Sequence, residues 1–95
     1  MASVIGYLEV ELHIPQAHSL KEKRSVIKRV LERLRGKFNV SVSEIDRQDS
    51  WQVSVIGVVT VGTSRQVVDA TLEKAVTFVE ELFPGLVVAY RKELF

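Results

Sequence analysis

The chain has 95 residues, of which 46% are hydrophobic and 26% charged, a balance that lets one domain spanning residues 1–95 bury a core. Because cysteine is absent, a disulfide-stapled scaffold, a thiolate nucleophile and the common cysteine-based zinc sites are excluded. The start lacks the basic segment of a signal peptide and the apolar runs are too short for a membrane span, so we expect a cytoplasmic protein without membrane contact.

Residues 4–14 alternate in polarity with the period of two that is typical of a half-buried strand. Every second residue, from Val4 through Leu8 to Ile14, is expected to face the core. Pro15 ends this strand because proline lacks the backbone N–H that a sheet requires.

A helix is predicted to begin after Ser19, because Ser19 and Glu22 have the spacing of a capping box. Apolar residues then recur at helical spacing, which predicts a stripe that packs against a sheet. We expect Gly36 to act as a left-handed C-cap, so that this helix ends at about residue 35.

A hairpin follows this helix. Residues 38–45 and 51–61 are predicted to be its two strands, joined by the polar turn at 46–50. In the first of them, Val40 and Val42 are expected to point inward.

The last part of the chain predicts a second helix and a final strand. Thr63 or Ser64 is expected to cap this helix, and Pro84 with Gly85 ends it. Residues 86–90 are predicted to form the last strand.

The element order is strand, helix, strand, strand, helix, strand, which predicts an α+β protein of the ferredoxin-like βαββαβ class. Right-handed crossovers then favour a four-stranded antiparallel sheet in the order 4-1-3-2. Both helices cover one face of this sheet, and the other face stays open.

One edge of the predicted sheet collects the side chains that are suited to chemistry. The first and second strands run in the same direction, so the loops that follow them meet at this rim. The candidate rim site consists of His13, His18, Asp46, Asp49 and Trp51. Histidine and carboxylates suit metal or acid-base chemistry, whereas the alternative is that His18 helps to cap the helix and His13 ends a strand.

No recognised catalytic or ligand spacing supports that chemistry. The chain lacks a GxSxG elbow, a P-loop, a GxGxxG turn and an HExxH pair. We therefore predict a protein that is not an enzyme, with no catalytic residues, no metal and no cofactor.

Positive charge is concentrated in the first helix. Residues 20–37 carry a net charge of +6, and the rest of the chain carries −5. The residues expected to form an exposed basic ridge are Lys21, Arg24, Lys28, Arg29, Arg33 and Arg35. Such a ridge suits the phosphates of a structured RNA, to which the helix N-terminus adds amide donors.

The second helix offers an alternative explanation of this ridge. It carries four carboxylates, Asp69, Glu73, Glu80 and Glu81. Ion pairs between the two helices would neutralise the ridge and leave an ordinary solvated face.

The open face of the sheet favours a second function. Its first strand places Tyr7 beside Glu9 and Glu11, and these carboxylates disfavour the stacking of RNA bases there. The same face is expected to expose Ile5 together with residues of the third strand, Ile56 and Val58. An exposed apolar group of this kind favours a homodimer or another protein contact.

Three segments resemble a known family. The stretch from Glu9 to Arg24, EVELHIPQAHSLKEKR, resembles the first conserved block of the YlxP-like family of bacterial proteins, and residues 38–42 and 48–52 resemble its later blocks. The resemblance covers essentially the whole chain. It implies a ferredoxin-like fold and a domain of unknown function without assigned catalytic residues, often encoded beside transcription and translation factors, including ribosome maturation proteins.

The sequence thus leads to two hypotheses. The first is a non-catalytic accessory protein that contacts ribosomal or other structured RNA through its basic helix. The second is a homodimeric protein-interaction module that associates through the open face of the sheet.

Overall fold

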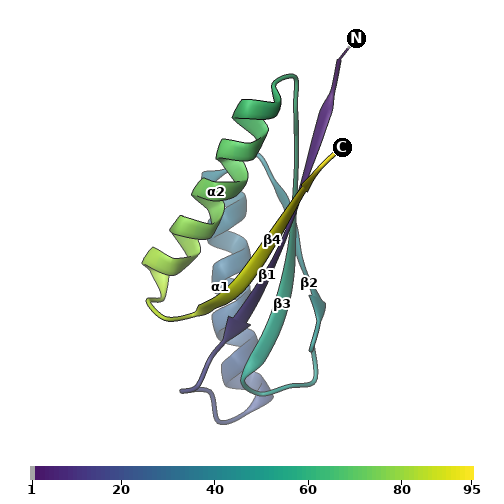
Figure 1. The fold of residues 1–95 in the computed structure, drawn as a ribbon. Coiled ribbons are helices and arrows are strands. Elements are labelled where there is room, and N and C mark those ends of the chain that lie inside the picture. Colours follow the sequence, from purple (N-terminus) through teal and green to yellow (C-terminus); the bar gives the residue numbers. More distant parts are fainter. Residues whose placement is uncertain (1) are drawn as a thin grey trace.

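The computed structural model describes residues 2–95, which form six elements in the predicted order. These elements are β1 (Val4–His13), α1 (Leu20–Lys37), β2 (Ser41–Asp46), β3 (Val53–Gly62), α2 (Arg65–Leu82) and β4 (Val87–Leu94). Both helices lie on one face of the sheet, and the other face is uncovered (Figure 1). Neither helix of the described chain combines the length and the apolar character needed to cross a membrane.

The sheet has the predicted topology. Its strands are ordered β2-β3-β1-β4, which is 4-1-3-2 read from the opposite edge, and each neighbouring pair is antiparallel. β1 and β3 therefore lie in the centre, whereas β2 and β4 form the two edges. This arrangement confirms the ferredoxin-like fold.

β1 has the predicted alternation between a buried and an exposed face. Its even-numbered residues face the helices, and Leu8, Val10 and Leu12 are fully buried. At Gly6 the strand comes close to α2, because a Cβ atom there would lie 2.5 Å from Cγ1 of Val68. Glycine at this position therefore allows α2 to lie against the sheet.

The N-terminus of α1 has the predicted cap. The Ser19 hydroxyl accepts the Glu22 N–H at 3.1 Å, and the Glu22 carboxylate accepts the His18 N–H at 2.6 Å. Two free donors at the start of the helix are thereby satisfied.

The prediction for the other end of α1 is wrong. The helix continues through Gly36 to Lys37, and within residues 2–95 only Arg47 and Gly85 have positive φ. The chain turns instead at Phe38, whose backbone is extended and whose ring packs on Phe78 with 5.6 Å between centroids. This tertiary contact, rather than a glycine cap, sets the end of the helix.

Strand boundaries also differ from the prediction. β2 begins at Ser41 rather than at residue 38, β3 begins at Val53 rather than at residue 51, and β4 continues to Leu94 rather than ending at residue 90. The charged residues after Tyr90 fit an edge strand, since side chains there reach solvent or a neighbouring helix.

The limits of α2 agree with the sequence. Ser64, not Thr63, is its N-cap and accepts the Val67 N–H at 3.3 Å. The helix ends before Pro84, and Gly85 has a φ of 86°, a left-handed conformation that favours glycine.

Candidate nucleic-acid interface

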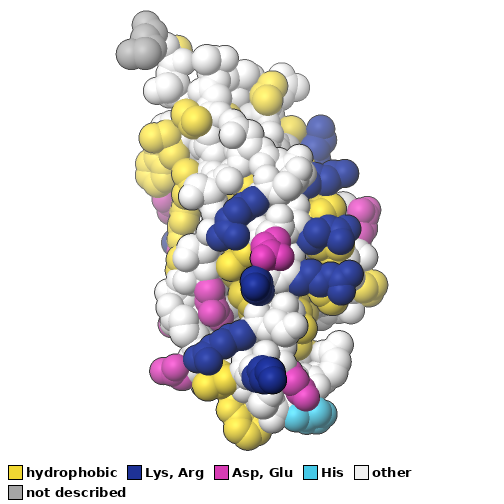
Figure 2. Space-filling model, turned by 180° about the vertical axis from the view of Figure 1, so that it is seen from behind, with side chains coloured by type: hydrophobic (Ala, Val, Ile, Leu, Met, Phe, Trp, Pro, Cys, Tyr) yellow, Lys and Arg dark blue, Asp and Glu magenta, His cyan; other side chains and the backbone are white. Residues whose placement is uncertain are grey.

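The basic residues of α1 form a ridge on the side of the molecule shown in Figure 2, where Lys and Arg side chains gather over the helix. α1 has 18 residues and therefore spans about 27 Å. All six residues of the predicted ridge are exposed: Lys21, Arg24, Lys28, Arg29, Arg33 and Arg35. The structure thus presents these charges to solvent along one helix.

Few of these charges are engaged within the molecule. Lys28 lies 4.0 Å from Glu32, and both side chains are more than half exposed, so this pair is weak. Arg35 donates to the Val42 carbonyl at 3.2 Å, and the Arg29 guanidinium lies 5.8 Å from the centre of the Phe83 ring. The remaining ridge residues, Lys21, Arg24 and Arg33, have no ion pair with any residue of the described chain.

Three of the four carboxylates of α2 bind groups outside α1. Asp69 and Glu73 each lie 2.7 Å from the Lys92 ammonium on β4. The hydrogen bond from Lys92 lowers the pKa of Glu73, with a further contribution from the Tyr90 hydroxyl. Glu80 accepts the Gly85 N–H at 2.6 Å. Within residues 2–95 no ion pair joins the two helices, so the cross-helix pairs of the alternative explanation are not formed there.

A shallow groove runs beside the ridge, between α1 and the edge strand β2. It has a volume of about 300 Å³, and its floor includes Ile27 and Leu31. Arg24, Lys28 and Arg35 line it together with the carboxylates of Glu32 and Glu44. Three cations and two carboxylates thus surround the apolar floor, so the groove itself has only a small excess of positive charge.

One basic residue of α1 does not belong to the ridge. Lys23 is fully buried, and its ammonium lies 2.7 Å from Glu44 of β2. It also donates to the carbonyls of Arg47 at 2.7 Å and Gln48 at 3.4 Å. Lys23 therefore fastens the hairpin loop to α1 and is unavailable to a partner.

The sequence prediction left out another basic residue that does extend the ridge. Lys37 is exposed in the last turn of α1, with its ammonium 5.5 Å from the centre of the Phe78 ring. Its position after Gly36 excluded it from the predicted helix. The longer helix found here adds this charge to the ridge.

The rim brings the two predicted loops together, although not through the predicted side chains. The Ile14 N–H donates to the Gln52 carbonyl at 2.7 Å, and the Gln52 amide donates to the carbonyls of Pro15 at 3.0 Å and Ala17 at 3.2 Å. The residues of the candidate rim site are all exposed: His13, His18, Asp46, Asp49 and Trp51.

The rim does not form a metal-binding cluster in the described chain. Residues 2–95 contain no group of three or more His, Cys, Asp or Glu side chains that could hold a metal ion. Asp46 instead accepts the Arg47 N–H at 2.7 Å, a contact that stabilises the turn. The hydrogen bonds of Gln52 join the two loops at this rim.

The predicted composition of the open face needs a correction. Ile56 and Val58 are fully buried beneath the helices and are absent from the open face. The neighbouring residues of β3 are exposed instead, Val59 by 39% and Val61 by 58%. Residues 53–61 place valines on both faces of the strand. No alternation of polar and apolar residues therefore showed which face is buried.

The open face has an apolar end and a charged end. Ile5 pairs with Val61 on one side and with Phe95 on the other, and all three are exposed. Further along, Glu9 accepts the Tyr7 hydroxyl at 2.7 Å and pairs with Arg91 at 2.8 Å. The hydrogen bond between Tyr7 and Glu9 is the main cause of a raised pKa of Tyr7 and a lowered pKa of Glu9, and Arg91 further lowers the pKa of Glu9.

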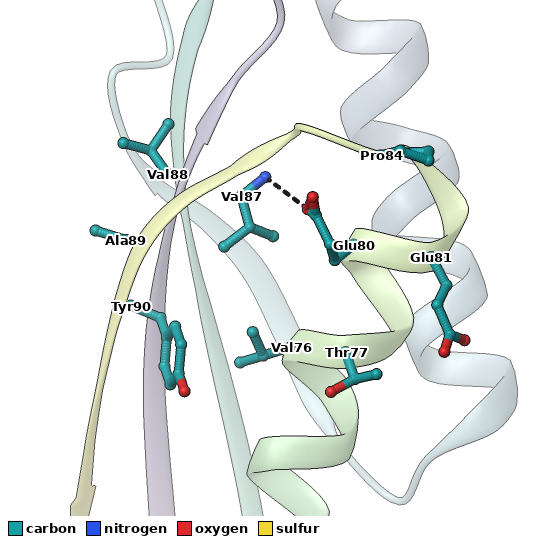
Figure 3. A pocket seen from close by; sticks show the side chains of 9 residues that line it. All are labelled: Val76, Thr77, Glu80, Glu81, Pro84, Val87, Val88, Ala89 and Tyr90. Atoms are coloured by element: carbon teal, nitrogen blue, oxygen red, sulfur yellow. Dashed lines mark hydrogen bonds between the residues drawn. The ribbon is translucent and has the colours of Figure 1, made fainter.

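A larger groove lies between α2 and β4 and was not predicted from the sequence (Figure 3). It has a volume of about 910 Å³. Val76 of α2 and Tyr90 of β4 face each other across it, and Glu80 accepts the Val87 N–H at 3.3 Å at one end. Its two walls come from separate elements, so no local pattern reveals it.

Comparison with known proteins places these features in a family. The model of the family described as "Protein of unknown function (DUF503)" matches residues 5–92. "Uncharacterized protein YlxP" of Bacillus subtilis (strain 168) is 46% identical over 83 residues, which cover 87% of this chain and 89% of that protein.

Two solved structures of designed proteins resemble the fold. The de novo designed protein Foldit4 aligns with a TM-score of 0.56 at 16% identity, covering 98% of this chain and 96% of the design. The designed protein LFR1 1, described as having a ferredoxin fold, aligns with a TM-score of 0.50 at 13% identity. The alignment covers 99% of this chain and 85% of the design. At these identities the likeness concerns the fold alone.

Proposed function

Since this chain belongs to the DUF503 family of proteins of unknown function, together with YlxP, we propose a function from its own surface: a cytoplasmic, non-catalytic accessory protein that binds ribosomal or other structured RNA through α1. The observation that carries this proposal is the exposed basic ridge, with which no carboxylate of α2 forms an ion pair within the described chain. A concentrated row of cations binds nucleic acid by releasing the counterions that surround its phosphates.

The ridge favours the backbone of a duplex over unpaired bases. Its exposed side chains are cationic and include no aromatic ring on which a base could stack. The helix N-terminus contributes a positive dipole at one end of the row. The resulting complex depends on phosphate contacts and has little sequence preference.

Salt titration of binding to a duplex RNA tests this function. If six side chains each neutralise one phosphate, the logarithm of the association constant falls against the logarithm of salt with a slope of about −5. A fluorescence anisotropy titration at several salt concentrations measures this slope. A slope near zero, or no binding at low salt, would reject the proposal.

Charge reversal on each helix supplies matched variants. Lys28→Glu with Arg29→Glu should weaken binding and bring the slope about 2 closer to zero, because two phosphate contacts are lost. Arg65→Glu with Lys74→Glu makes the same change in net charge at exposed positions of α2. Equal weakening by both double variants would show that net charge, not the ridge, governs binding.

A second candidate is a homodimeric interaction module. Two surfaces favour it: the exposed apolar end of the open face, around Ile5 and Val61, and the free edge of β4. Exposed apolar groups and unpaired strand edges both promote association between copies. Sedimentation analysis of the purified chain tests this candidate, since a monomer at all concentrations would exclude it.

A further inference from the structure

The two edges of the sheet differ in how well they are protected. β2 is six residues long, its pairing is irregular between Glu44 and Asp46, and Arg35 binds its Val42 carbonyl. Each of these features hinders the addition of another strand. β4 is eight residues long and its pairing with β1 is regular from Ala89 onward, so β4 is the better edge for a new strand.

The register of β4 shows which of its backbone groups are free. Phe95 and Ile5 exchange both of their backbone hydrogen bonds, at 3.1 and 2.8 Å. In an antiparallel pair every second residue bonds to the same neighbour. The N–H and C=O groups of Tyr90, Lys92 and Leu94 therefore point away from β1, along the free edge.

The charged residues of β4 select the strand that can pair with it. Arg91 and Glu93 lie on the open face, where the Arg91 guanidinium lies 3.0 Å from the Glu93 carboxylate. Lys92 lies on the helix side, where Asp69 and Glu73 balance its charge. An incoming strand should thus offer an acid opposite Arg91 and a base opposite Glu93.

We propose that this strand is β4 of a second copy, paired antiparallel about a two-fold axis at Lys92. In this register Arg91 lies opposite Glu93 of the second copy, and the symmetry repeats this opposite-charge pair. The exposed Phe95 lies opposite the small Ala89 of the second copy. Leu94 of the second copy lies opposite Tyr90, at the mouth of the groove between α2 and β4.

Neighbouring symmetric registers are less favourable. An axis at Arg91 places two guanidinium groups opposite each other, and an axis at Glu93 does the same with two carboxylates. An axis at Tyr90 leaves Arg91 opposite Ala89. Like charges directly opposite in a sheet are destabilising. The axis at Lys92 also places two ammonium groups opposite each other, but each of them is paired with Asp69 and Glu73 of its own copy. Among the symmetric registers only this one adds two Arg91–Glu93 pairs between the copies, so we select it.

This proposal rests on the second candidate function and is independent of RNA binding. It yields one continuous sheet of both copies with all helices on one side. α2 contacts β1 and β4, whereas α1 contacts β2, so the two α1 ridges lie toward the outer sides of that shared helical face.

Cysteine scanning tests the register, because the natural chain contains no cysteine. Lys92→Cys places two Cα atoms about 5.5 Å apart, within the range of a disulfide. Arg91→Cys places them diagonally, about 7–8 Å apart, which is too far. With oxidised glutathione as the oxidant, we expect the covalent dimer to form at least about tenfold faster at position 92 than at position 91.

The open face provides the control. Val61→Cys is exposed on that face and should cross-link no faster than Arg91→Cys. Faster cross-linking at 61 than at 92 would overturn the edge proposal while keeping the homodimeric module. A wild-type chain that sediments as a monomer would overturn both.

Charge exchange supplies a test that leaves Lys92 in place. Arg91→Glu and Glu93→Arg should each favour the monomer, since each creates like charges across the strands. The double variant restores opposite charges and should recover the dimer mass. Failure of this recovery in folded protein, judged by circular dichroism, would also overturn the proposed register.

Discussion

Lys23 occupies the first turns of α1, within the same basic segment as the ridge, yet its side chain is fully buried. Its charge is balanced by Glu44, which also accepts the Ser54 hydroxyl at 2.6 Å. Residues 2–95 contain no buried side-chain polar atom without a partner, so this network is fully satisfied. A buried charge is tolerated only under such conditions.

Removing the Lys23 ammonium should therefore be costly. Lys23→Met keeps the length of the side chain but leaves Glu44 without its cation and the Arg47 carbonyl without its donor. We expect the free energy of unfolding to fall by about 3 kcal/mol, measured by urea denaturation. Lys21→Met, an exposed position on the same helix, should change it by no more than about 0.5 kcal/mol. Similar effects of the two variants would contradict a structural role for Lys23.

Helical spacing sets Lys23 apart from its basic neighbours, because it lies four, seven and eleven residues before the buried Ile27, Val30 and Leu34. The predicted ridge accordingly left it out, but its partner Glu44 lies on another element and could not be found from spacing. The six ridge residues were predicted to be exposed on the basis of their helical angle, and all six are. Which charges are internally paired depends on contacts between distant segments, which spacing does not encode.

At the scale of elements, the sequence predicted which face of a strand is buried only where the other face is polar. β1 alternates polar and apolar residues, so its buried face followed from the sequence. β3 has valines on both faces, and its two faces were assigned the wrong way round at Ile56 and Val58. Binary patterning carries information only where the polarity of the two faces differs.

Two glycines provide a matched test of how the elements pack. Gly6→Ala puts a Cβ atom 2.5 Å from Val68 on α2, and the resulting overpacking should destabilise the protein by about 2 kcal/mol. Gly36→Ala meets no atom within 4 Å and lies inside α1. It should stabilise the protein by about 0.5–1 kcal/mol, because alanine favours a helix interior. Thermal unfolding measures both changes, and destabilisation by Gly36→Ala would indicate a left-handed cap after all.

At the scale of the whole molecule, charge is separated between surfaces. The ridge of α1 is basic, whereas Asp69 and Glu73 of α2 pair with Lys92 of β4 and the carboxylates of β1 lie on the open face. A nucleic acid that approaches the ridge therefore meets few carboxylates on the same surface. The net charge of +1 conceals this separation, which the charge of +6 on residues 20–37 already indicated in the sequence.

The two proposals together predict that duplex length controls affinity. A dimer paired through β4 carries two α1 ridges on one side, so a duplex long enough to reach both binds the second ridge at a high effective concentration. We expect the wild-type chain to bind such a duplex at least about tenfold more tightly than the monomeric Arg91→Glu variant does. A duplex that spans only one ridge should bind both proteins equally, because α1 is unchanged in the variant. Anisotropy titrations with the two lengths measure this difference, and equal affinities for the long duplex would show that the ridges act singly.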